Sequence, residues 1–201
     1  VIGQVGQGHG QQMVDPVAGI KLTGRSGPYS IGWLSEADSY EGSRDYLEGR
    51  YYPQEIVDKY RDKTTYNNIL RIKRNVLDNS FMGMILTDRE FDDSYNRVYG
   101  LDGSFSFMNN YHLAMQALYS QTQTLEQEKR EDPAFFLSFY HGTRKLKIQA
   151  FYKDIDKNFV AENGFIRRTD IRDGTLRVWY DMQWTGRIIQ HFQPMIEYYR
   201  I

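Results

Sequence analysis

The sequence lacks cysteine, long apolar runs and any excess of one charge. Without cysteine the chain has no disulfide and no thiolate metal site. Because no run of about 18 apolar residues occurs, a transmembrane helix is excluded, and a membrane protein of this sequence must be a β-barrel. The 25 basic and 26 acidic side chains give a formal charge of -1, so no overall field attracts nucleic acid, and we expect no nucleic-acid partner.

The sequence also lacks the local signatures of catalysis. No GxSxG, HExxH or Walker-type stretch is present, so we predict no enzyme activity, no catalytic residues and no cofactor. The four histidines His9, His112, His141 and His191 have no spacing that places two on one strand face, so we predict no metal site. The acidic stretch 87–93 is typical of a solvated hairpin turn rather than a calcium loop.

What the chain has in abundance is aromatic side chains in alternating patterns. It contains 16 Tyr and 11 Phe, residue types that favour strands. In the stretch 111–120, apolar and polar side chains alternate, with Tyr111 and Tyr119 at the two ends of the apolar face. An apolar face flanked by aromatic residues is typical of a barrel strand in lipid. Several alternating runs reach the length of about 9 to 11 residues that a lipid-spanning strand needs.

Turn residues divide the chain into about ten such strands. We expect turns at 25–27, 78–79, 92–93, 109–110, 142–143, 156–163 and near Gly186, and long polar loops at 41–64 and 121–133. Residues 55–63 within the first loop are expected to form about two helical turns. The predicted fold is therefore an all-β, antiparallel up-and-down meander of about ten strands, which is part or all of a transmembrane β-barrel. Residues 1–201 are expected to be one barrel domain or a fragment of one.

The polar and aromatic positions of these strands provide the candidate site residues. Alternation places Arg71 and Lys73 on one strand face, where pairing with an acid such as Asp102 is favoured over an anion-attracting surface. The candidate lumen-lining residues are Arg71, Lys73, Asp102, Gln116, Arg177 and Asp181. The candidate membrane-interface aromatics are Tyr111, Tyr119, Tyr180 and Trp184.

The stretch 69–122 resembles the central hairpins of a family of bacterial outer-membrane barrel proteins of unknown function. The matching residues are Arg71, Arg74, Gly83, Thr87, Arg89, Asn96, Gly100 and Asp102. Segments 18–35 and 158–170 are similar to the first hairpin and to a strand-joining segment of the same family, in the same order. Members of this family typically carry a carbohydrate-binding (family nine, DOMON-like) domain ahead of the barrel.

The resemblance implies a bacterial outer-membrane location, with outer-membrane lipid as the partner and other envelope proteins or an N-terminal carbohydrate-binding domain outside this chain as further partners. It implies no activity. The sequence starts at Val1 without an export signal, so we expect any such signal to have been removed or to lie outside this piece. It ends at 196–201 without a terminal aromatic residue, so we expect further strands to follow.

Two functions stay open from the sequence. The first is an outer-membrane β-barrel protein of unassigned activity that acts as a pore, a scaffold or a surface anchor in the cell envelope. The second is a soluble glycan-binding β-domain, favoured by the tyrosine and tryptophan content and by the polar loops. Dependence on detergent distinguishes the two.

Overall fold

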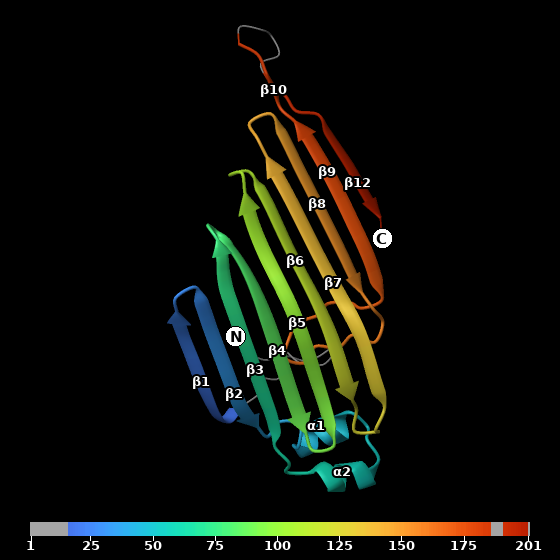
Figure 1. Ribbon diagram of the computed structural model, residues 1–201. Helices are drawn as coiled ribbons and strands as arrows, with labels where there is room; N and C mark the ends of the chain where they lie inside the picture. The colour runs from blue at the N-terminus through green and yellow to red at the C-terminus, as the bar shows by residue number, and fades with distance from the viewer. Residues whose placement is uncertain (1–15, 186–190, 201) are drawn as a thin grey trace.

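The computed structural model describes residues 16–185 and 191–200, which form a ten-stranded antiparallel sheet (Figure 1). Consecutive strands pair along the sheet, which confirms the predicted all-β, up-and-down meander. The predictions for His9 and for the turn near Gly186 lie outside the described residues. The sheet strands are β1 (Pro16–Ser26), β2 (Tyr29–Asp38), β3 (Thr65–Leu77), β4 (Ser80–Phe91), β5 (Ser94–Phe107), β6 (Tyr111–Gln123), β7 (Lys129–Gly142), β8 (Leu146–Ile155), β9 (Ile171–Tyr180) and β12 (Met195–Arg200).

The short turns contain residue types that tolerate a left-handed backbone. Gly27, Asn79 and Asp92 have φ angles of 54°, 57° and 52°, which glycine, asparagine and aspartate adopt more readily than other residues. Arg25 and Ser26, predicted as part of the first turn, belong to β1 instead. The Gly27–Pro28 pair alone makes that turn, because Ser26 pairs with Tyr29.

The two long loops differ from their predicted form. The segment between β2 and β3 contains α1 (Arg44–Gly49) and α2 (Gln54–Tyr60), so the predicted helical turns exist and a second helix precedes them. The expected loop at 121–133 is wrong in extent, because β6 continues to Gln123 and β7 starts at Lys129. Polar side chains do not weaken backbone pairing, and the ladder therefore continues through polar residues at this end of the sheet.

The sheet is open within the described residues. Strands β1 and β12 form its two edges, and no pairing joins them. Between β9 and β12 the chain makes a small extension from β10 (Met182–Gln183) and β11 (His191–Phe192), which pair with each other. None of the described helices is long and apolar enough to span a membrane.

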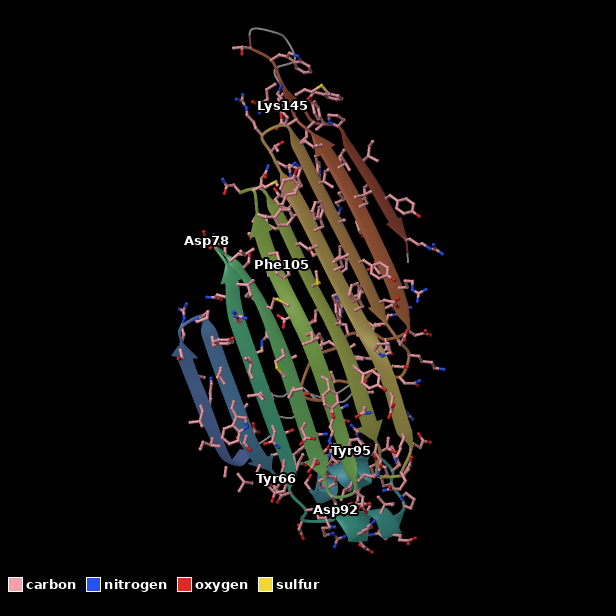
Figure 2. All side chains as sticks on the ribbon, in the orientation of Figure 1. Tyr66, Asp78, Asp92, Tyr95, Phe105 and Lys145 are labelled. Carbon is pink, nitrogen blue, oxygen red and sulfur yellow. The ribbon has the colours of Figure 1, made fainter. Side chains whose placement is uncertain are left out.

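One end of the sheet is covered by the helices and by the segment 156–170, which passes behind the strands in Figure 1. We call this end the helix end and the opposite one, which carries the turn at Asp78 and Asn79, the hairpin end (Figures 1 and 2). The helices bury a first apolar cluster, made by Leu47, Val57, Tyr60, Phe91 and Leu125. The segment 156–170 buries a second one, made by Val98, Ala134, Ile155 and Phe159.

Phe159 is expected to hold this segment against the sheet. It is 1% exposed, whereas Phe165 in the same segment is 73% exposed. We expect Phe159→Ala to lower the free energy of unfolding by about 3–5 kcal/mol, because it leaves a cavity. Phe165→Ala is the matched control and should have little effect. Denaturant unfolding of both variants tests the expectation, and equal losses would contradict it.

Candidate functional site

The two faces of the sheet differ in chemistry. Register aligns Lys73, Gly83, Asp102, Gln116 and Phe136 across five neighbouring strands, so these residues share one face. The segment 156–170 packs against this same face. We call it the inner face and the opposite one the outer face.

The outer face carries an apolar band that crosses the whole sheet. Its side chains are open to the surroundings: Leu101 is 67%, Leu22 56% and Met82 55% exposed. Scattered apolar side chains are ordinary on a soluble protein, but a contiguous band of this extent is not. The band consists of Ile20, Leu22, Ile31, Trp33, Leu70, Ile72, Met82, Met84, Leu86, Tyr99, Leu101, Phe105, Phe107, Leu113, Met115, Ala117, Phe135, Leu137, Phe139, Ile148, Ala150, Leu176, Val178 and Ile196.

Aromatic side chains mark both limits of this band on β5 and β6. Tyr99 pairs with Tyr119 toward the helix end, and Phe107 pairs with Tyr111 at the hairpin end. The rings of Phe107 and Tyr111 stack with centroids 5.2 Å apart. The band from Tyr99 to Phe107 is about 27 Å long along the strand, and about 20 Å deep if the strand tilts by about 40°. That depth is close to the apolar height of an outer-membrane barrel, about 25 Å.

The other two predicted interface aromatics lie near the hairpin end. Tyr180 ends β9 on the outer face, opposite Leu146 of β8. Trp184 follows β10, beyond the end of the band, and is 36% exposed. Three of the four predicted aromatics therefore lie at the limits of the outer-face band, and Trp184 lies past it.

Polar side chains replace apolar ones on the outer face toward the helix end. Arg97 donates to Asp88 at 3.0 Å and also pairs with Glu90. The Tyr119 hydroxyl donates to Glu131 at 2.6 Å. Tyr66 and Tyr95 lie at this end of the sheet, whereas Phe105 lies nearer the hairpin end (Figure 2). The change from apolar to charged side chains is therefore abrupt on β4 and β5.

The inner face holds five of the six predicted lumen residues. Arg71, Lys73, Asp102, Gln116 and Arg177 share it by register. Asp181 lies beyond the end of β9, where its Oδ1 is 3.1 Å from Nε2 of His191. The nearest acid to Arg177 is Glu197 of β12, at 2.7 Å, which the sequence reading did not identify.

Arg71 and Asp102 make the predicted ion pair across an intervening strand. Both Arg71 Nη atoms donate to the Asp102 carboxylate at 2.6 Å, from β3 to β5 over β4. Gly83 of β4 leaves the room for this, because a Cβ there would lie 2.6 Å from Arg71 Nη1. Lys73 extends from the same strand over the ring of Phe81, with Nζ 3.8 Å from the centroid.

Arg89 is the centre of a buried polar cluster at the helix end. It is 8% exposed and pairs with Glu41 from the segment before α1 and with Glu162, at 2.6 Å, from the segment 156–170. Glu41 in turn accepts from the hydroxyls of Thr65 and Tyr46, each at 3.1 Å. One arginine thus connects three segments that are far apart in the sequence.

Burial raises the pKa of the Tyr46 phenol far above its ordinary value, and the nearby Glu41 carboxylate acts in the same direction. The phenol therefore keeps its proton and donates a hydrogen bond to Glu41 over the whole physiological pH range. This donor stabilises the Glu41 carboxylate that faces Arg89.

Inner-face side chains also bind the backbone of the segment 156–170. Asn96, which is fully buried, donates to the Val160 carbonyl at 3.0 Å and accepts from the Glu162 amide at 2.9 Å. Ser120 accepts from the Val160 amide at 3.2 Å, and Asp132 from the Asn158 amide at 2.6 Å. The segment is therefore held by side chains from β5, β6 and β7.

The sequence resemblance included Arg89 and Asn96 but gave them no role. Alternation in β4 places Arg89 on the same face as Gly83, which is a signal that it points inward. No local pattern identifies Glu41 or Glu162 as its partners. Among the described residues, no group of His, Asp or Glu side chains is arranged to hold a metal ion.

We expect the Arg71–Asp102 pair to depend on Gly83. A double-mutant cycle with Arg71→Gln and Asp102→Asn should give a coupling free energy of about 1.5–3 kcal/mol. In a Gly83→Val background the coupling should fall toward zero, because the added side chain occupies the path of the guanidinium. Gly32, which pairs with Arg71 on β2 and has open space around it, is the control for valine substitution. Unchanged coupling in the Gly83→Val background would refute this dependence.

Arg89→Met is expected to destabilise the chain by about 3–5 kcal/mol, because Glu41 and Glu162 are left without their cation. Arg97→Met is the matched control on the outer face, where a half-exposed pair contributes about 0–1 kcal/mol. Denaturant unfolding of the two variants provides the comparison. Similar losses in the free energy of unfolding for the two variants would show that burial does not increase the contribution of the Arg89 ion pairs to stability.

Comparison with known proteins assigns no family to the chain. No family model, curated protein or solved structure matches it. A function must therefore be inferred from the chemistry of the two faces.

Proposed function

We propose that this chain is part or all of an outer-membrane β-barrel protein of the bacterial cell envelope, with its outer face in lipid and its inner face toward the lumen. The observation that supports this most strongly is the outer-face apolar band, which lies between aromatic side chains and crosses every strand of the sheet. A lipid-facing surface needs such a band, since each polar side chain in hydrocarbon costs free energy.

The distribution of charge agrees with this orientation. The ion pairs at the level of the band, such as Arg71–Asp102 and Arg177–Glu197, lie on the inner face. The charged outer-face residues lie toward the strand ends: Asp88 and Arg97 toward the helix end beyond Tyr99, and Arg74 near the hairpin end of β3. Barrel interiors are polar and their lipid faces apolar, and the alternation of each strand satisfies both requirements.

The covered helix end favours a scaffold, a surface anchor or a plugged barrel over a wide open pore. Asn96, Ser120 and Arg89 hold the segment 156–170 across the inner face at this end. The unpaired edges of β1 and β12 offer backbone groups to further strands, whether these come from the same gene product or from another chain. Pairing there would close the barrel.

The soluble glycan-binding alternative is less well supported. A soluble domain with this sheet would need to cover the outer-face band, and among the described residues the helices and the segment 156–170 pack on the other face. Leu101 and Met82 would then be exposed to water at an unfavourable free energy.

Adjacent cysteine variants give a direct test, because the chain has no cysteine of its own. Met115→Cys places a label on the outer face in the middle of the band, and Gln116→Cys places one on the inner face of the same strand. After refolding into lipid vesicles, acyl-chain nitroxides should quench the Met115 label much more strongly than the Gln116 label.

Lys145→Cys in a turn at the hairpin end is the control for a label outside the hydrocarbon (Figure 2). The folded chain should also need detergent and should change its gel migration on heating. Equal lipid quenching at positions 115 and 116, or a folded monodisperse protein in water without detergent, would refute the proposal.

A further inference from the structure

A row of small side chains crosses the inner face between two phenylalanines. Register aligns Ser104, Ala114 and Ser138 on β5, β6 and β7, with Phe81 of β4 on one side and Phe151 of β8 on the other. Small residues between large ones leave a hollow of about 250 Å³, which Phe136 and Gln116 also line. The distance from β4 to β8 is about 19 Å across four strand spacings.

A second hollow of about 270 Å³ continues the first beyond Phe151. It is lined by Ser138, Gln149, Phe151, Thr175 and Arg177, so the two hollows share Ser138 and the ring of Phe151. Phe151 is 37% exposed and is thus one of the few large apolar side chains that are open on the inner face. The pair of hollows forms one elongated site with an aromatic ring near its middle.

The uncharged polar side chains of this site are available to bind a ligand. The described residues offer no side-chain hydrogen-bond partner to Gln116 or Gln149, nor to the hydroxyls of Ser104, Ser138 and Thr175. Amides and hydroxyls can each donate and accept, so they can bind a ligand that carries many hydroxyl groups.

The two charged side chains that line the hollows are already paired. Asp102 is held by both Nη atoms of Arg71, and Arg177 is held by Glu197 at 2.7 Å. Lys73 lies on one face of Phe81, and the rings of Phe136 and Phe151 also line the first hollow, with Phe151 the more exposed of the two. A charged ligand that bound Asp102 or Arg177 would have to compete with an existing ion pair, so charge complementarity at these two residues favours a neutral ligand.

We propose that this elongated inner-face site binds a neutral oligosaccharide, with sugar rings against Phe136 and Phe151 and sugar hydroxyls bound by Gln116, Gln149, Ser104 and Ser138. A sugar ring combines an apolar face with a rim of hydroxyls, which is the combination that the site offers. The inference rests on the proposed barrel, because the inner face must be a wet lumen for a soluble sugar to reach it.

The test is calorimetric titration of the folded full chain, in a detergent without a sugar headgroup, with neutral hexasaccharides such as maltohexaose, cellohexaose and laminarihexaose. A hexasaccharide of galacturonic acid is the charged comparison. We expect at least one neutral sugar to bind and the charged one to bind more weakly.

Phe151→Ala and Ser138→Trp should each weaken the binding by about tenfold or more, the first by removing the ring and the second by filling both hollows. Phe135→Ala is the matched control, because Phe135 neighbours Phe136 in β7 but lies on the outer face. Heat-modifiable migration of each variant shows that it is folded.

A folded, detergent-dependent chain that binds none of the neutral sugars, or that prefers the charged one, would overturn this inference and leave the barrel proposal intact. Binding that survives both Phe151→Ala and Ser138→Trp would also overturn it. A chain that is folded and soluble without detergent would instead overturn the barrel proposal.

Discussion

The antiparallel register is the constraint on which the rest of this structure depends. Side chains alternate with a period of two, so a slip of one residue in any strand would move its apolar residues from the outer face to the inner one. From β4 to β9 the pairing runs without a shift, and the two irregularities, at Pro16/Ala18 and Asn75/Leu77, lie near strand ends. The continuous apolar band and the ion-paired inner face are two consequences of this one register.

The inner-face charges have different roles at different heights along the strands. Arg71 of β3 and Asp102 of β5 form an ion pair across β4, where Gly83 leaves room for the guanidinium. Arg89 instead connects β4 to segments that arrive from outside the sheet, and burial makes its two carboxylate partners necessary. The helix end is therefore closed by long-range polar contacts, while the middle of the face keeps open hollows around Phe151.

These arrangements together describe a molecule with three chemical zones. Lipid is the proposed environment of the band that contains Leu101 and Met115, and water is that of the Gln116 and Gln149 amides. The third zone is the helix end that contains Asn96, which the helices and the segment 156–170 cover. A strand with alternating residues serves the first two zones at once, because one of its faces is apolar and the other polar. Only the third zone needs residues that lie outside the sheet.

The alternating residues of the sequence were sufficient to predict the strands and the shared face of Arg71 and Lys73, because side-chain direction in a strand depends only on residue parity. Asp102 was expected only as one example of an acid that could pair with Arg71, and the register across β4 decided that pairing. The extent of the ladder at 121–133 was not predictable from polarity, since pairing there joins backbone atoms. The partnership of Arg89 with Glu162, 73 residues away, and the hollows beside Ser138 were decided by tertiary structure alone. No local pattern states which loops fold back over the sheet or which small residues align across β5, β6 and β7.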